Sequence, residues 1–329
     1  MDNLIFTLNA ILPIIFCILI GYSLKLLKIF PNTFWPTLNK LCFKVFLPLL
    51  LFKNIYDIED ISDVKTYWKI LLFVAIFIIC VFFIGLVIVK LFVKEDKQKG
   101  VILQCIFRSN YAIIGIGLIE LLAEGNQEAK GIGAIISAVS IPLFNILAII
   151  ALTLFIKDEN GKKIKPTEIL LKICKNPLII AVFTGLIFLS IKSLSFDYLG
   201  HKNTKFMYTT VKWLAQCASP CALIALGGVF TFSAVKRLKY QIILGTSLRI
   251  IAVPALGLVI AYILGFDDIR YFPALIALFG TPVAVSSVPM AAEMQNDSEL
   301  AGQLVVWCSL LSAITLFIII LISKACGCL

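Results

Sequence analysis

Arg108 is the residue of this chain that most directly suggests chemistry, because it lies inside a long apolar segment, two positions before Asn110. If that segment crosses a membrane, a charge near its centre costs about 2.5–3.5 kcal/mol and needs a partner or water. One interpretation is a counter-ion for a carboxylate, which arginine holds through two parallel hydrogen bonds. The alternatives are an internal ion pair or a side chain that reaches for the membrane surface.

The segment around Arg108 is one of two that look interrupted. It covers Gln104–Gly117, and the other covers Phe279–Pro289, which is rich in glycine, serine and proline. A broken helix exposes backbone polar groups, which a membrane tolerates only where they line a cavity or are buried in protein. The N–H groups at the start of two half-helices would favour an anion between them. The alternative is a pair of simple Gly/Pro kinks.

Further polar residues complete the predicted site. Arg249 lies in another apolar segment and has the same interpretations as Arg108. Uncharged polar side chains offer hydrogen bonds to a substrate or contacts between helices, namely Asn145, Gln216, Ser219, Ser286 and Ser287. The predicted substrate contacts are Arg108, Ser109, Asn110, Asn145, Arg249, Thr281, Pro282 and Ser286. Glu120 and Glu293 lie beyond these segments, at the ends of the two broken helices. One interpretation is that they relay protons, and the alternative is that they are solvated acids at helix ends.

The composition places these residues in a membrane protein. Hydrophobic residues make up 60% of the chain and charged residues 15%, with a mean hydropathy of +1.02. Soluble domains are nearer half apolar and a quarter charged. These values exclude a disordered protein, a coiled coil, an ordinary soluble enzyme and a nucleic-acid-binding domain, despite the net charge of +10.

Ten apolar segments are candidates to cross the membrane, since a helix needs about 20 apolar residues to do so. They are Leu4–Leu24, Leu38–Phe52, Ile70–Val89, Val101–Leu122, Gly131–Ile156, Asn176–Ile191, Trp213–Val235, Tyr240–Phe266, Tyr271–Ala292 and Leu300–Ser323. The connections are short and polar, so we expect no separate soluble domain. The predicted fold is an all-α polytopic membrane protein.

The two halves of the chain resemble each other. Pro13 and Gly21 match Pro177 and Gly185 at an offset of 164, and later pairs match at an offset of 172. At the second offset Asn110 falls on Pro282, so both interruptions occupy the same place in their halves. We therefore predict a first five-helix repeat over residues 1–156, a cytoplasmic linker over 157–166 and a second repeat over 167–329.

An odd number of spans per repeat means that the second copy enters the membrane upside down. Inverted repeats are common in secondary transporters, where the substrate binds near the middle of the membrane between discontinuous helices. We therefore expect the fourth and ninth spans to be broken and to cross each other.

Lysine and arginine placement predicts the orientation. One set of alternating connections holds fifteen of these residues, and the other holds nine together with the acidic residues of 57–63. The positive-inside rule assigns the first set to the cytoplasm, which places both termini outside the cell membrane. The connection from Glu293 to Glu299 dissents, because it should lie inside and carries no basic residue.

Metal and nucleophile chemistry find little support. Most of the ten cysteines lie in apolar runs, where cysteine acts as a small hydrophobe. The single histidine, His201, leaves little material for a Cys/His metal site. No nucleophile and base are arranged together, so we expect neither an enzyme nor a cofactor.

The motifs resemble those of the auxin efflux carrier family and its bacterial permease branch. The segments that carry the resemblance are Arg108–Gly117, Pro142–Asn145, Lys175–Leu178 with Gly185, and Ser219–Gly228. The resemblance implies two inverted five-helix bundles and transport of small organic anions such as malate, malonate or auxin. Two departures from plant members favour a dicarboxylate: the chain has no large loop between the fifth and sixth spans, and Asn110 and Pro282 split the plant-type Asn-Pro pair.

The leading hypothesis is a secondary carrier that exposes a small organic anion alternately to the two sides of the membrane. The coupling ion, H⁺ or Na⁺, and assembly as a homodimer stay open. A sodium-coupled symporter of the bile-acid type and a membrane sensor without transport are the alternatives.

Overall fold

The computed structural model describes residues 2–57, 66–123, 125–156, 174–194 and 204–329, and every regular element in them is a helix. The elements, with η for π-helical turns, are α1 (Asp2–Leu26), α2 (Phe34–Leu41), η1 (Cys42–Phe46), α3 (Leu47–Tyr56), α4 (Trp68–Phe92), α5 (Asp96–Phe107), η3 (Tyr111–Gly115), α6 (Ile116–Leu122), α7 (Gln127–Leu154), α9 (Pro177–Leu194), α10 (Lys205–Val229), α11 (Ser233–Arg237), α12 (Lys239–Ser247), η4 (Leu248–Ala252), α13 (Val253–Ile263), α14 (Phe272–Gly280), α15 (Ser287–Glu293) and α16 (Ser298–Ala325). The predicted all-α class is confirmed for this part of the chain.

Several helices are suited to a membrane. Within the described residues, four helices are each long and apolar enough to cross one: Trp68–Phe92, Gln127–Leu154, Lys239–Ile263 and Ser298–Ala325. Shorter apolar helices cover Leu12–Leu26, Tyr111–Leu122 and Pro177–Lys192. The predicted number of ten spans stays a prediction.

The outer surface supports the same environment. Large apolar side chains project outward from α1, α4 and α13, including Phe16 (58% exposed), Phe83 (57%) and Ile263 (75%). Soluble monomers rarely expose contiguous apolar surface on this scale, whereas lipid tails cover it without cost.

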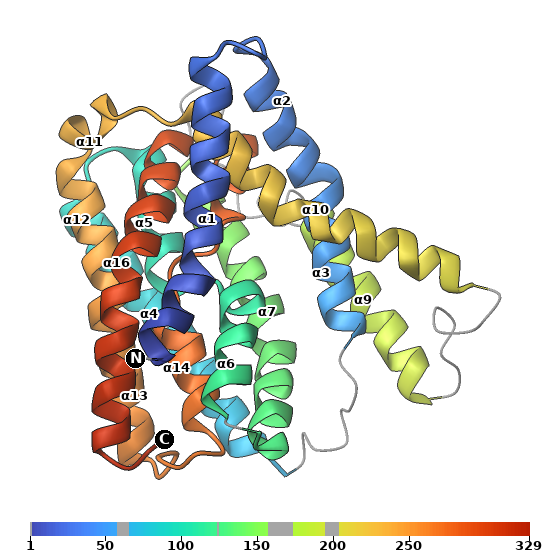
Figure 1. The fold of residues 1–329 in the computed structure, drawn as a ribbon, viewed down its shortest axis with the longest axis vertical. Helices are drawn as coiled ribbons and strands as arrows, with labels where there is room; N and C mark the ends of the chain where they lie inside the picture. Colours follow the sequence, from blue (N-terminus) through green and yellow to red (C-terminus); the bar gives the residue numbers. More distant parts are fainter. Residues whose placement is uncertain (1, 58–65, 124, 157–173, 195–203) are drawn as a thin grey trace.

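The helices form two packing groups (Figure 1). In one group α1, α2 and α3 pack with α9 and α10, and in the other α4 to α7 pack with α12 to α16. α1 also contacts α16, which joins the groups. Each group takes helices from both sides of residues 157–166, so the packing units are not the two halves of the sequence.

The interruptions predicted in two segments are present. The first helix stops at Phe107 and resumes at Tyr111, and the second stops at Gly280 and resumes at Ser287. In the first, the short polar side chains of Ser109 and Asn110 compete with helical backbone bonding. In the second, Pro282 drives the preceding Thr281 into an extended conformation, with ψ at 149°.

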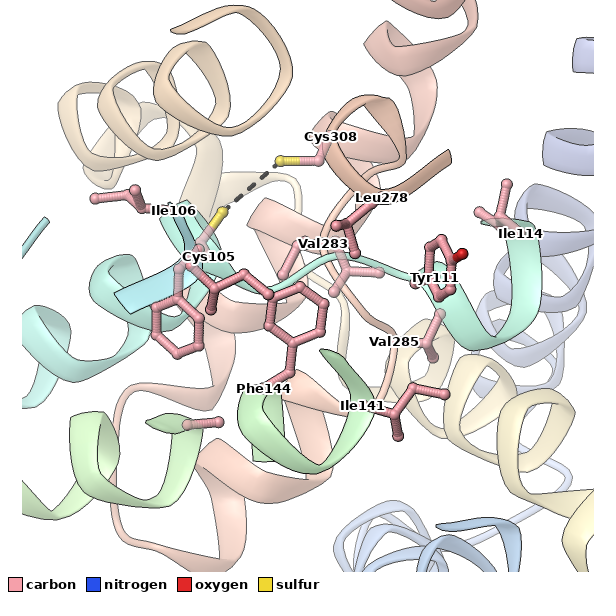
Figure 2. Close-up of a cluster of buried hydrophobic side chains, with 14 of the residues drawn as sticks. Cys105, Ile106, Tyr111, Ile114, Ile141, Phe144, Leu278, Val283, Val285 and Cys308 are labelled. Carbon is pink, nitrogen blue, oxygen red and sulfur yellow. Dashed lines mark hydrogen bonds between the residues drawn. The ribbon is translucent and has the colours of Figure 1, made fainter. Parts of the chain in front are cut away.

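The two interruptions cross each other. Ser109 and Val283 form an isolated antiparallel bridge, and the backbone N–H of Asn110 donates to the carbonyl of Pro282 over 2.8 Å. Buried apolar side chains surround the crossing, among them Phe144 from α7 (Figure 2). Nearby, the sulfurs of Cys105 and Cys308 lie 3.8 Å apart and bring α5 against α16 (Figure 2). The backbone groups that lose their helical hydrogen bonds at the two breaks therefore lie inside the protein, where a membrane protein tolerates them.

Candidate functional site

A cavity lies where the crossing faces the other packing group. It is lined by Leu47, Leu50, Leu51, Asn54, Arg108, Ser109, Asn110, Tyr111, Ala112, Ile113, Ile141, Phe144, Asn145, Leu178, Ala218, Ser219, Ala222, Ala284, Val285 and Ser286. Tyr111, Ile141, Phe144 and Val285, drawn in Figure 2, belong to its apolar wall. The centre of a water molecule can occupy about 50 Å³ of it. One water needs about 10–15 Å³ by this measure, so the cavity suits a ligand of a few heavy atoms.

Arg108 supplies a positive charge to this cavity. The residue is 4% exposed and directly follows the end of α5 in an extended conformation. One guanidinium nitrogen donates to Asn145 Oδ1 over 2.7 Å and to Ser286 Oγ over 2.8 Å. The other contacts Gln104 Oε1 at 3.3 Å and Met290 Sδ at 2.8 Å.

All four of these partners of Arg108 are uncharged. No ion pair of Arg108 with an Asp or Glu is found among the residues that the structure describes. A buried charge is normally paired with an opposite charge, since hydrogen bonds to neutral groups compensate only part of its lost hydration. The arrangement thus leaves Arg108 able to take an anionic partner from the cavity.

Other hydrogen-bond donors of the cavity also favour an anionic ligand. Asn54 Nδ2, Ser109 Oγ and Asn110 Nδ2 are buried atoms of cavity-lining residues, and none has a hydrogen-bond partner in the described part of the chain. The helix Tyr111–Leu122 also begins at the cavity wall, which places the positive end of its dipole there. A carboxylate could accept from these groups as well as from Arg108.

Arg249 lies outside the cavity lining and is held by the protein backbone. The residue is 1% exposed and sits in η4. Its guanidinium donates to the carbonyls of Thr281 (2.7 Å), Phe279 (2.9 Å) and Leu278 (3.2 Å) at the end of α14. It also approaches the carbonyls of Ile106 (3.4 Å) and Phe107 (3.5 Å) at the end of α5. The carboxyl-terminal ends of both broken helices thus share one positive charge, as their dipoles favour.

Comparison with known proteins identifies the family. The profile of a family described as "Membrane transport protein" matches residues 6–320. The chain belongs to this family, that of the auxin efflux carriers. A protein of Rhizobium meliloti (strain 1021) bearing the name "Putative malonate transporter" is 25% identical over 316 residues, which cover 93% of this chain and 92% of that protein.

As a member of a membrane transport family the protein is a multi-pass membrane protein and not an enzyme. Part of the predicted site comes together in a way that suits such a protein: Arg108, Ser109, Asn110, Asn145 and Ser286 all line the cavity. Ser219, from the wider set of polar residues, lines it too. Within the described chain no group of three His, Cys, Asp or Glu could hold a metal ion.

Three predicted site residues, Thr281, Pro282 and Arg249, are not among the residues that line the cavity. Thr281 is fully buried, and its hydroxyl donates to the carbonyl of Ala277 over 2.8 Å. The carbonyl of Pro282 accepts a hydrogen bond from the backbone N–H of Asn110, which lines the cavity. Arg249 faces the carbonyls at the helix ends. A direct contact of these three with substrate stays a prediction.

Sequence reasoning missed Asn54. The predicted second span ends at Phe52, but the helical run α2–η1–α3 continues to Tyr56. Leu47, Leu51 and Asn54 follow a spacing of i, i+4 and i+7, which places them on one helix face. That spacing is the available signal for Asn54, although the charged Lys53 interrupts the apolar segment just before it.

Proposed function

We propose that this protein is a secondary transporter that moves a small organic anion, such as malonate or a related dicarboxylate, across the cell membrane. The proposal rests above all on Arg108, a buried cation with uncharged partners that lines a small cavity at the crossing of two broken helices. The name of the Rhizobium meliloti relative supports the same class of substrate.

The chemistry of the cavity favours a carboxylate over a cation. Arg108 offers planar donors, Ser109 and Asn110 carry donors without partners, and a helix amino terminus faces the same space. Leu50, Ile141 and Val285 provide apolar contacts for a short carbon chain. A ligand with one carboxylate near Arg108 and a small body matches this combination of groups.

The proposed architecture is ten spans in two inverted repeats, residues 1–156 and 167–329, joined by a cytoplasmic linker over 157–166, with both termini outside. Because the cavity lies between the two packing groups, movement of one group against the other would open it to each side in turn.

The direct test is uptake of radiolabelled malonate by proteoliposomes that contain the purified protein. We expect saturable uptake that empty liposomes lack. Arg108→Gln should weaken malonate binding by about 30-fold or more, because it removes the charged member of a buried pair. The variant keeps a hydrogen-bonding side chain, so it should still fold.

Two outcomes would contradict the proposal. Saturable uptake that survives Arg108→Gln with unchanged affinity would remove the assigned role of Arg108. No flux for malonate, malate or any other small anion, together with a stable protein partner in mild detergent, would favour a sensor. Repeating the assay with and without sodium tests the bile-acid type of coupling.

A further inference from the structure

A second polar chamber lies beside the central cavity. We call it the lysine chamber; Lys53, Asn54, Asp57, Glu120, Lys130 and Ile141 are among its lining residues. The centre of a water molecule can occupy about 240 Å³ of it. Asn54 and Ile141 line both spaces, so the lysine chamber adjoins the cavity that holds Arg108.

The lysine chamber lies between the same two packing groups as the cavity. Lys53 and Asn54 come from α3, whereas Glu120 comes from α6 and Lys130 from α7. On α7, Lys130, Ser137, Ile141 and Asn145 follow a spacing of i, i+7, i+11 and i+15, which keeps them on one face. This face extends about 22 Å from Lys130 to Asn145, at about 1.5 Å per residue. It forms a continuous wall from the lysine chamber to a partner of Arg108.

In the described part of the chain, each lysine of the chamber forms an ion pair with one acidic residue. Lys130 Nζ lies 2.5 Å from Glu120, and Lys53 Nζ lies 2.6 Å from Asp57. Asp57 also accepts a hydrogen bond from Tyr208 of α10. The side chains of Lys130 and Glu120 are 26% and 57% exposed, so solvent reaches this pair. Exposed ion pairs are weak, and a carboxylate that arrives from solution can compete for the lysine.

A second pocket, at the other end of the interface between the two packing groups, has a different lining from the lysine chamber. It is lined by Phe43, Thr153, Ile156, Asn176, Glu293, Met294 and Gln295. Of the described residues that line it, none is a lysine or an arginine, and none is shared with the central cavity. Among the described residues, the cavity that holds Arg108 thus shares lining residues with the lysine chamber and not with this second pocket.

We propose that the lysine chamber is an anion-loading site on the route to Arg108. A carboxylate of the incoming substrate takes the place of Glu120 on Lys130 or of Asp57 on Lys53, and then moves along α7 to Arg108. The inference rests on the proposed function. In the topology proposed above α7 begins outside, so the lysine chamber serves substrate that arrives from the outside.

Two substitutions with opposite expected effects test this role. Lys130→Gln should raise the KM for malonate about two- to fivefold, the range of one exposed charge contact. Glu120→Gln should lower the KM, because it frees Lys130 from its competitor. Both should change the KM in right-side-out membrane vesicles and leave it unchanged in inside-out vesicles. A purely structural ion pair would give the same direction of change for both variants.

The chain offers a matched control in Lys99, which pairs with Asp96 at 2.7 Å with a side chain that is 17% exposed, outside the chamber. Lys99→Gln should leave the KM unchanged. Lys53→Gln gives a second variant should Lys130→Gln fail to fold. Normal malonate uptake with an unchanged KM in both chamber variants would overturn the loading site and leave the proposed function intact. Absence of uptake by the wild-type protein would overturn the proposed function itself.

Discussion

Arg108 and Arg249 are both buried next to the crossing, yet their surroundings differ in kind. Arg249 contacts five backbone carbonyls at the ends of α5 and α14. Arg108 contacts uncharged side chains and lines the cavity. The helix ends, which carry partial negative charge, thus contact the positive charge of Arg249. Arg108 instead faces the cavity, and no described residue that lines this cavity or bonds Arg108 carries a negative charge. The two arginines therefore differ in their contacts: Arg249 holds the crossing together, whereas the charge of Arg108 is available to a ligand in the cavity.

The largest effect should come from removing the charge that holds the helix ends. Arg249→Met deprives five buried carbonyls of their donors, and each unsatisfied polar group costs about 1–3 kcal/mol. We expect the free energy of unfolding in detergent micelles to fall by about 3 kcal/mol or more. Chemical denaturation followed by tryptophan fluorescence measures it.

The same substitution at the other arginine is the matched control. Arg108→Met frees side-chain acceptors that face a cavity large enough for water, so its loss of stability should be clearly smaller. Equal destabilisation by the two variants would contradict the proposed difference between the two arginines, because both would then be structural.

The second prediction concerns the shape of the Arg108 side chain. Arg108→Lys keeps the positive charge but loses the planar pair of donors, so the variant should stay folded and bind malonate about tenfold more weakly. Stabilisation of the purified protein against heat by malonate measures the binding. Unchanged stabilisation would mean that a point charge suffices and that two-point recognition plays no part.

The sequence was sufficient to predict that two segments break, and where. Asn110 and Pro282 hold matched positions in the two halves, and short polar residues or proline at those points leave the backbone little choice. Asn145 and Ser286, which the sequence offers as substrate contacts, line the cavity beside Arg108, since polar residues in apolar helices usually face protein; their contact with substrate stays a prediction.

The role of Arg249 could not be predicted in the same way. Its partners are backbone carbonyls, which every residue carries, so no residue type marks them. The two packing groups could not be predicted for a related reason. The sequence shows the repeats, but contacts between segments far apart in the chain decide which helices of each repeat pack together.

A smaller effect is expected for the neutral partners of Arg108. Ser286→Ala removes an acceptor 2.8 Å from the guanidinium, and Asn145→Ala removes another at 2.7 Å. Each should weaken malonate binding about three- to tenfold, because water in the cavity can replace the lost acceptor and the net contribution of a typical hydrogen bond is about 0.5–1.5 kcal/mol. Titration of the thermal shift with malonate checks this. Tighter binding in either variant would show that these acceptors compete with the substrate for Arg108 and do not position it.

The smallest effect should come from Thr281, on the Arg249 side of the crossing. Its backbone carbonyl holds the guanidinium, whereas its hydroxyl only donates to Ala277 within α14. Thr281→Val keeps the shape and the carbonyl, so the free energy of unfolding should change by about 1 kcal/mol at most. The affinity for malonate should not change, in contrast to Ser286→Ala. A loss of affinity similar to that of Ser286→Ala would place the hydroxyl in contact with substrate in another conformation, and the division between the two sides of the crossing would then depend on the transport state.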